Sequence, residues 1–108
     1  MSGPSALAPL PTSVIVVSRG RPAHLQLCLT ALAQQDHPDF EIILVADPEG
    51  LQQCPDLPLK RVGFDVPNIS RARNLGLAQA AGSVIAFIDD DSVAEPTWLA
   101  RLTAPFAD

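Results

Sequence analysis

Three short, mainly apolar segments limit what this chain can fold into. They occupy residues 13–18, 41–46 and 83–88, and valine and isoleucine supply much of each segment. None of them alternates apolar with polar residues, which predicts strands that are buried on both faces. Such strands are typical of a parallel sheet that is covered by helices on each side.

Helical patterns occupy the intervals between these segments. A helix is predicted over residues 22–35, and a second one is capped by Asn68 or Ser70 and closed by Gly82. A last helix is predicted over residues 96–106, because a proline opens it. The buried stripe of the first helix is predicted to consist of Leu25, Cys28, Leu29 and Leu32.

The remaining segments of the chain have weaker sequence patterns. Residues 1–12 are rich in Pro, Ser and Ala and are expected to form a flexible leader. Residues 48–58 are expected to form a loop with one short helical turn, and residues 59–64 a weaker strand. Strands that alternate with helices predict one α/β unit over residues 13–108, an open, mainly parallel, Rossmann-like sheet with flanking helices.

Composition narrows the classes of function. The chain has 108 residues, of which 47% are hydrophobic and 18% are charged, so one small packed domain is expected. Its formal net charge of -5 leaves no basic face for a phosphate backbone, and nucleic acid is therefore not an expected partner. An acidic chain that binds a phosphorylated ligand needs a metal ion or a few well-placed arginines.

The sequence also bears on the compartment. Cys28 and Cys54 have neither metal-ligand nor redox-motif spacing, which predicts free thiols in a reducing environment. No apolar segment approaches the roughly 18 residues of a membrane span, and the leader lacks the basic start of a secretory signal. A cytoplasmic domain is predicted, with membrane contact only through other parts of a longer protein.

Polar and charged residues follow the three strong strands. Ser18 and Arg19 follow the first strand, Asp47 follows the second, and Asp89–Asp91 follow the third. Because ligands of open α/β sheets bind at the carboxyl ends of the strands, a site is predicted at this edge. There is no G-x-G-x-x-G after the first strand and no Walker A loop, which weighs against dinucleotide enzymes and P-loop ATPases.

The acidic residues at this edge each allow two interpretations. Asp89–Asp91 can hold a divalent cation, because adjacent carboxylates repel one another and Mg²⁺ or Mn²⁺ prefers oxygen ligands. They can also form a solvated turn that caps the last helix. Asp47 can initiate a turn with Pro48 or accept hydrogen bonds from a base or ribose, and the residues alone favour the turn.

Arg71 and Arg73 lie at the start of the second predicted long helix. Because they are two positions apart they cannot share a face, so Arg73 can meet a pyrophosphate or base while Arg71 faces solvent, or the reverse. The alternative, which is the commoner case, is that both belong to a solvated polar face. An arginine at a helix N-terminus is disfavoured by the helix dipole, and its placement there points to a nearby anion.

Four segments in sequence resemble family 2 glycosyltransferases, with matching order and spacing over residues 13–102. They correspond to the opening strand and turn, the Phe-Glu-Ile-Ile strand that ends in aspartate, the Ala-Arg-Asn-x-Gly helix, and the D-x-D strand end with its following helix. These segments are Ser13–Pro22, Gln34–Asp47, Ser70–Leu77, and Ile85–Ser92 with Glu95–Leu99.

The resemblance implies a GT-A fold, a nucleotide-diphosphate sugar as donor and Mn²⁺ or Mg²⁺ as cofactor. A UDP-sugar is the commonest donor in the family. Asp91, with Asp89, is the implied metal ligand, and the metal would offset charge on the departing nucleotide diphosphate. The implied nucleotide-sugar-binding residues are Ser18, Arg19, Asp47, Arg73, Asp89 and Asp90.

The sequence departs from the family pattern at several positions. Arg19 stands where an aromatic residue often stacks on the base, Gly20 replaces the usual Asn, and Ala46 replaces the first aspartate of a pair. Arg19 can stack on a base or meet a phosphate. Pro48 replaces the usual Gly or Asn.

The resemblance covers the donor-binding half of an inverting enzyme. The acceptor site and general base of the family lie beyond this half, so the chain is expected to be a truncated domain that binds a donor without transferring its sugar. The alternative is a non-catalytic GT-A-like remnant that binds ligands or self-associates through an exposed sheet edge. A receiver-like domain is disfavoured, because the only lysine, Lys60, starts the weak middle strand.

Overall fold

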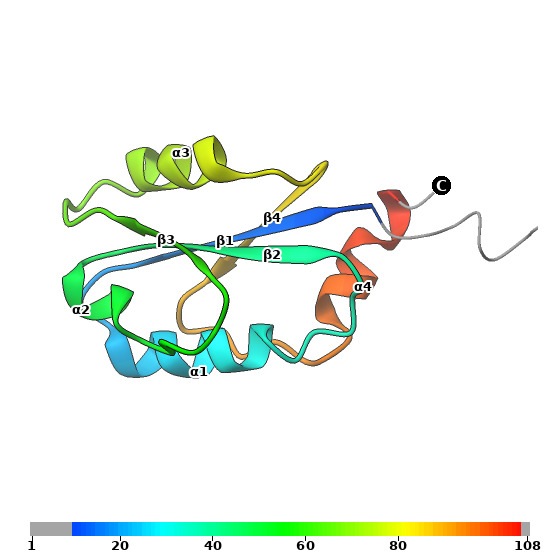
Figure 1. Cartoon of the computed structure of the whole chain (residues 1–108), viewed down its shortest axis with the longest axis horizontal. Helices are drawn as coiled ribbons and strands as arrows, with labels where there is room; N and C mark the ends of the chain where they lie inside the picture. Colours follow the sequence, from blue (N-terminus) through cyan, green and yellow to red (C-terminus); the bar gives the residue numbers. More distant parts are fainter. Residues whose placement is uncertain (1–9, 107–108) are drawn as a thin grey trace, which may run out of the picture.

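A four-stranded parallel sheet forms the centre of the molecule. The computed structural model describes residues 10–106. The strand order is β3-β2-β1-β4, and every pairing is parallel, as the sequence predicts. The strands, which run from right to left in Figure 1, are β1 (Thr12–Ser18), β2 (Phe40–Ala46), β3 (Lys60–Gly63) and β4 (Val84–Asp89).

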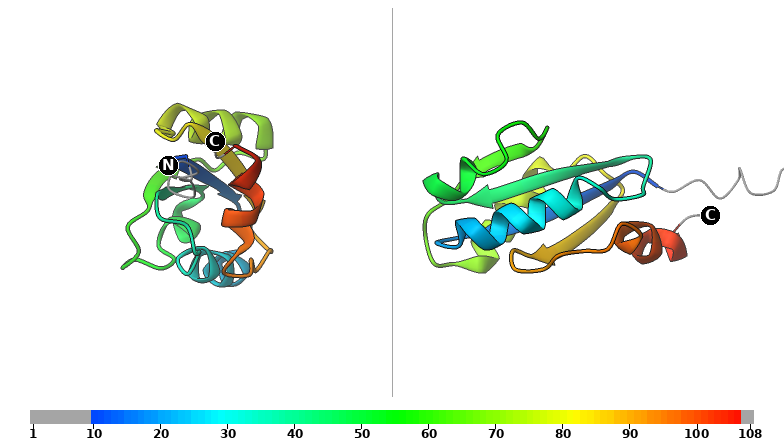
Figure 2. Two further views of the ribbon diagram at one scale, coloured as in Figure 1. Left: turned by 90° about the vertical axis from the view of Figure 1, so that its right-hand side faces the viewer. Right: turned by 90° about the horizontal axis from the view of Figure 1, so that it is seen from below.

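Helices cover both faces of this sheet. The helices are α1 (Pro22–Leu32), α2 (Pro48–Leu51), α3 (Ile69–Gln79) and α4 (Trp98–Thr103), and a 3₁₀ turn, η2 (Ala104–Phe106), follows α4. α3 lies on one face, whereas α1 and α2 lie on the other (Figure 1). Seen from the α1 side, α1 lies over the sheet roughly along the direction of the strands, and α4 lies near the amino ends of the strands (Figure 2). No helix among residues 10–106 is long and apolar enough to cross a membrane.

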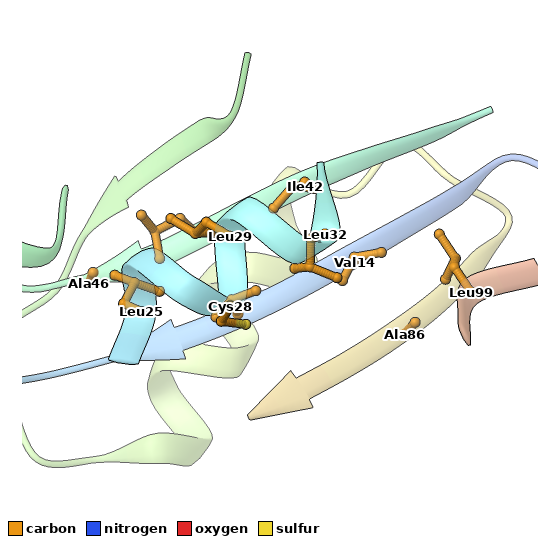
Figure 3. Close-up of a cluster of buried hydrophobic side chains, with 11 residues drawn as sticks. Val14, Leu25, Cys28, Leu29, Leu32, Ile42, Ala46, Ala86 and Leu99 are labelled. Atoms are coloured by element: carbon orange, nitrogen blue, oxygen red, sulfur yellow. The ribbon is translucent and has the colours of Figure 1, made fainter. Parts of the chain in front are cut away.

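The larger hydrophobic core lies between the sheet and α1. Side chains of α1 point toward β1, β2 and β4, and Leu99 of α4 closes the cluster at one end (Figure 3). All members of the predicted α1 stripe are buried, which confirms that prediction. The buried members of the cluster are Val14, Val16, Leu25, Cys28, Leu29, Leu32, Ile42, Leu44, Ala46, Ala86 and Leu99.

A second core lies between the sheet and α3. Ile15, Ile43 and Val45 pack there against Ala72. Because Val14 and Ile15 are neighbours in β1 and face opposite cores, the strand is buried on both faces, as the absence of alternation predicts. Gly76 allows α3 to approach closely: an added Cβ would lie 2.7 Å from the Ile15 Cγ2.

Several element ends differ from the sequence predictions. α1 ends at Leu32 rather than near residue 35, because Gln35 is recruited by the segment before α4: its side chain donates to the Glu95 carbonyl and accepts from the Leu99 amide, both at 2.8 Å. α4 begins at Trp98 rather than at residue 96. Before α4 the chain makes a turn, in which the Trp98 amide donates to the Glu95 carbonyl at 2.9 Å.

The turn from α3 into β4 also differs. α3 ends at Gln79, and Gly82, which was predicted to close the helix, lies three residues beyond. The Gly82 amide instead donates to the Ser13 Oγ at 2.8 Å, and an added Cβ would lie 2.7 Å from the Ser13 nitrogen. β1 begins at Thr12, the last residue of the expected leader, and residues 1–9 of that leader lie outside the described part of the chain.

Candidate functional site

The carboxyl edge of the sheet brings the ends of β1 and β4 together. These strands are neighbours in parallel register, with Val17 opposite Asp89. The residues that follow them therefore meet across a sequence separation of more than 70 positions, and the Ser18 Oγ donates to the Asp90 Oδ2 at 2.8 Å. The structure thus brings Ser18 and the Asp89–Asp91 turn into one cluster.

The three aspartates of this turn differ in environment. Asp90 is buried, with 9% of its side chain exposed, and its second oxygen lies 3.3 Å from the Arg21 guanidinium. Asp91 is half exposed and its Oδ2 lies 3.4 Å from the same guanidinium. Asp89 is exposed, and its side chain makes no hydrogen bond or ion pair with other described residues. Only Asp90 is therefore held on both of its oxygens.

Cys28 of α1 lies beneath the acidic turn. Its Sγ is 3.5 Å from the Asp89 carbonyl oxygen, to which the thiol can donate. Burial, together with the negative charges of Asp90, Asp91 and Asp89, raises the pKa of Cys28 to about 12. The thiol therefore stays protonated and is unsuited to act as a nucleophile. Cys28 and Cys54 are both free, as predicted.

Asp47 holds two neighbouring loops together. Its Oδ1 accepts from the Gly50 amide at 3.1 Å and caps α2, while its Oδ2 accepts from the Gly20 amide at 3.0 Å. Gly20 has a φ of 71°, which favours glycine at that position of the β1–α1 loop. The turn interpretation of Asp47 is thus confirmed. Its side chain lines neither of the two cavities described below.

Two arginines of α3 lie over different aromatic rings. The Arg71 guanidinium lies 5.6 Å from the Phe64 ring centre, and the Arg73 guanidinium lies 5.5 Å from the Phe87 ring centre. Asn68 supplies the cap of α3 by accepting from the Arg71 amide at 3.1 Å. The expectation that Arg71 and Arg73 face different surroundings is correct, and Arg73 is the one beside the acidic turn.

Two cavities open at this edge of the sheet. The smaller one has a volume of about 230 Å³ and is lined by the acidic turn, Arg73 and Phe87, among others. The larger one, of about 410 Å³, lies between the β1–α1 loop and the start of α3, and Ser18, Arg19 and Phe64 contribute to its lining. The cavities share a wall made of Val17, Arg21, Ile69 and Asp90.

Arg19 lies at the larger cavity but makes no hydrogen bond or ion pair with the acidic turn. Its Nε donates to the Asp65 Oδ1 at 2.9 Å, and both side chains are about half exposed. The pair connects the β1–α1 loop to the segment that precedes α3. Such an exposed ion pair contributes little to stability, so its position leaves Arg19 free to meet another partner.

The acidic turn offers carboxylate oxygens and little else to a metal ion. Among residues 10–106 there is no group of three or more His, Cys, Asp or Glu side chains that could hold a metal. Two carboxylates nevertheless suit Mg²⁺ or Mn²⁺, since such ions are often held by one or two carboxylates together with phosphate oxygens of a ligand. Asp89 and Asp91 fit this requirement, whereas Asp90 has both oxygens engaged.

Sequence reasoning missed Arg21 and Phe87 as residues of this site. Arg21 is the N-terminal boundary residue of α1, and it makes no side-chain cap there. The same dipole argument that singled out Arg71 and Arg73 applies to Arg21, because a cation at a helix N-terminus needs an anion nearby. Phe87 gave no such signal, since an aromatic residue in an apolar strand is ordinarily part of a core.

Comparisons with known proteins agree with this architecture. The sequence model described as glycosyl transferase family 2 matches residues 13–108. The O-antigen biosynthesis protein RfbC of Myxococcus xanthus is 33% identical over 102 residues, which cover 85% of this chain and 8% of RfbC. The chain thus spans a small part of this relative.

Solved structures show the same fold. S. aureus TarS 1-349 in complex with UDP-GlcNAc superposes with a TM-score of 0.72 and 27% identity, over 88% of this chain and 30% of that one. A mannosyltransferase of Pyrobaculum calidifontis, in complex with GDP-Man and Mn²⁺, gives a TM-score of 0.78 at 22% identity, over 94% and 35% of the two chains. The parallel sheet and its helices therefore have the GT-A fold, and the chain belongs to glycosyl transferase family 2.

Proposed function

We propose that this chain binds a nucleotide-diphosphate sugar and forms the donor-binding part of an inverting, metal-dependent glycosyltransferase. The observation that carries the proposal is the pair of cavities with a shared wall at the carboxyl edge of the sheet. An elongated ligand with a ring system at one end and phosphates at the other fits across two such cavities. TarS 1-349, which is 27% identical, has been solved in complex with UDP-GlcNAc and supports the same ligand class.

The smaller cavity is the proposed place of the diphosphate. Arg73 lines it and supplies a positive charge, and its guanidinium is held over the Phe87 ring. Asp91, with Asp89, would hold Mn²⁺ or Mg²⁺ there, and a bound divalent cation would neutralise charge on the departing nucleotide diphosphate. Asp91 offers an Oδ1 that makes no hydrogen bond or ion pair with other described residues. Asp90 acts mainly as an anchor in this arrangement.

The larger cavity is the proposed place of the nucleoside. Ser18 and Arg19 line it, and the Arg19 guanidinium can stack on a base. Asp47 does not line this cavity but supports it by accepting from the Gly20 amide, and a donor group of the base or ribose would have to extend beyond the cavity to reach a remaining lone pair of its carboxylate. A UDP-sugar is the proposed donor, because it is the commonest donor of the family.

A thermal-shift panel tests the proposal. UDP, GDP, CDP and TDP would each be added with and without Mn²⁺. A ligand at about 100 times its Kd stabilises a folded protein by about 2.7 kcal/mol, which raises the Tm of a domain this small by roughly ten degrees or more. We expect one nucleotide to shift the Tm only when Mn²⁺ is present. Absence of a shift with every pair would contradict donor binding by this chain.

The variant Asp91→Ala tests the metal assignment. We expect it to abolish Mn²⁺-dependent nucleotide binding in calorimetry while the circular dichroism spectrum stays unchanged, because Asp91 is half exposed and its ion pair is weak. Asp56→Ala is the matched control, since Asp56 is an exposed aspartate that lines neither cavity. Binding that survives in Asp91→Ala would remove Asp91 from the proposed metal site.

Self-association is a second candidate role. β4 is an edge strand of the described sheet, and Phe87, Val93 and Leu102 on or after it are each more than 40% exposed. An unpaired apolar edge of this kind can pair with a second copy. Light scattering over a range of concentrations distinguishes the roles: a dimer that persists in the presence of nucleotide and Mn²⁺ favours the association module, and a monomer removes it.

A further inference from the structure

Arg21 connects the acidic turn to both cavities. Its two terminal guanidinium nitrogens face different carboxylates, with Nη1 at 3.3 Å from the Asp90 Oδ1 and Nη2 at 3.4 Å from the Asp91 Oδ2. The side chain belongs to the wall that the two cavities share. Because the guanidinium is planar and rigid, it fixes the relative placement of the two carboxylates that it touches.

The two contacts of Arg21 are not equivalent. Asp90 is buried and is also held by the Ser18 hydroxyl, so removing its positive partner would leave a poorly compensated charge. Asp91 is half exposed and has no other partner among residues 10–106. The contact with Asp91 is therefore the one that Arg21 can give up at low cost.

Charge balance indicates what would replace this contact. Arg21 and the two aspartates carry a net charge of one negative unit when all three are ionised, so the guanidinium acts as their internal counter-ion. A divalent cation near Asp91 would repel the guanidinium, whereas a diphosphate would attract it. The shared wall places the guanidinium between the proposed nucleoside and diphosphate cavities, where a spanning ligand would pass.

We propose that Arg21 is a positioning residue of the donor site. It keeps Asp90 in place, and when Asp91 binds a divalent cation, Arg21 replaces its contact with Asp91 by a contact with the donor's diphosphate. This inference rests on the proposed function. It predicts that Arg21 affects the two kinds of ligand in opposite directions. Toward the cation alone, Arg21 is a competitor for Asp91, but toward a nucleoside diphosphate with the cation it is a partner.

Calorimetry on the full chain with R21Q, R21K and the control R101Q tests this exchange. Mn²⁺ alone should bind R21Q about two- to fivefold more tightly than the wild type, the range expected for loss of a partly exposed ion pair. UDP or GDP with saturating Mn²⁺ should bind R21Q about tenfold more weakly, the size of one charge-assisted hydrogen bond. R21K keeps the positive charge but not the planar pair of donors of a guanidinium, so its nucleotide affinity should lie between those of R21Q and the wild type. R101Q should match the wild type in both titrations.

Opposite changes in the two titrations are the signature of exchange, because a variant that merely loosens the fold lowers both affinities together. The inference would be overturned if R21Q lost affinity equally for Mn²⁺ and for the nucleotide, or if neither affinity changed. Mn²⁺ binding that stays undetectable in both the wild type and R21Q would also overturn it. If the wild type binds Mn²⁺ but no nucleotide, and R21Q binds Mn²⁺ more tightly, the competition for Asp91 stands while the proposed function fails. If the wild type binds nucleotide and R21Q is unchanged, the proposed function stands alone.

Discussion

Arginine geometry decides much of the local structure at the residue scale. Arg61 of β3 donates to four main-chain carbonyls: those of Leu51 at 2.9 Å, Gln53 at 2.8 Å, Cys54 at 2.6 Å and Leu57 at 3.4 Å. These carbonyls lie at the end of α2 and in the irregular segment after it. Those of Cys54 and Leu57 also accept from the main-chain amides of Leu57 and Leu59, at 3.0 and 2.9 Å, so one guanidinium adds to the few main-chain hydrogen bonds of this segment.

Replacement of Arg61 tests this role. We expect Arg61→Lys to lower the free energy of unfolding by about 1–3 kcal/mol, because an ammonium group cannot reach carbonyls on several sides at once. Urea denaturation followed by circular dichroism measures the change. Arg101→Lys serves as the control, since Arg101 is exposed and makes no ion pair within the described part of the chain. A change of less than about 0.5 kcal/mol for Arg61→Lys would mean that water serves these carbonyls equally well.

Some residues of the candidate site could be predicted from the sequence, and others could not. Ser18 and the acidic turn were predicted at one edge because they follow strands, and local order along the chain suffices for that, whereas Arg73 was placed near the nucleotide by the family resemblance. Arg21 was missed because its contacts with Asp90 and Asp91 cross about 70 positions of sequence. Such pairings depend on the order of strands in the sheet, which residue patterns alone do not specify.

At the scale of elements, the amino edge of the sheet is held by one carboxylate. Glu41 of β2 accepts from the Ser13 hydroxyl and from the Ala81 amide, and its other oxygen lies 2.8 Å from the Lys60 Nζ. Lys60 also donates to the Gln79 carbonyl at the end of α3. The carboxylate of Glu41 in β2 therefore connects β1, β3 and the turn after α3.

Stability should therefore depend on pH through Glu41. Partial burial raises the pKa of this carboxyl, but the hydrogen bonds from Lys60, Ser13 and Ala81 outweigh it and lower the pKa from 4.5 to about 2. A depressed folded-state pKa means that the stabilisation is fully present above about pH 4.5 and is lost as the pH falls toward 2. Glu41→Gln should be less stable than the wild type at pH 7 and nearly equal to it near pH 2. Urea denaturation of both proteins across this range measures the convergence, and a constant difference would contradict it.

The close packing of α3 on the sheet can be tested by whether Gly76→Ala raises or lowers the free energy of unfolding. In an exposed helix, Gly→Ala stabilises by about 1 kcal/mol. At Gly76 the added Cβ would lie 2.7 Å from the Ile15 Cγ2, and a buried β-branched side chain has little freedom to move. We therefore expect Gly76→Ala to lower the free energy of unfolding by about 1–3 kcal/mol in chemical denaturation. A stabilised variant would show that α3 can shift outward without loss.

Elements were more predictable than their ends. Continuous apolar segments identified β1, β2 and β4 as strands. Burial on both faces was right for β1 and β2 but wrong for β4, an edge strand in which only Ala86 is buried and Phe87 is 43% exposed. The ends of α1 and α4 were wrong because they are set by contacts between distant segments, such as the bonds of Gln35 with Glu95 and Leu99. The short β3 was predicted only weakly, since two of its four residues are exposed and carry little apolar signal.

At the scale of the whole molecule, the candidate site holds one group of carboxylates and, among residues 10–106, no second acid or base beside it. The only carboxylates that line the two cavities, within the part of the chain that the structure describes, are those of Asp89–Asp91. We expect the chain by itself to bind a donor and transfer little or no sugar in a donor-consumption assay. Turnover well above the background measured without protein would contradict this expectation.

The strand order has a consequence for the order in which parts of the molecule fold. β1 and β2 are neighbours in the chain as well as in the sheet, and β3 follows β2, so this half can form from contacts of short range. β4 must close a loop of about 66 residues to pair with β1, which is the slowest kind of step in a parallel sheet. The Ser18–Asp90 hydrogen bond and both Arg21 ion pairs come into being only with that step. An ensemble arrested before it would contain most of the secondary structure but not this cluster, so affinity for the proposed donor would report the last event of folding rather than its average progress.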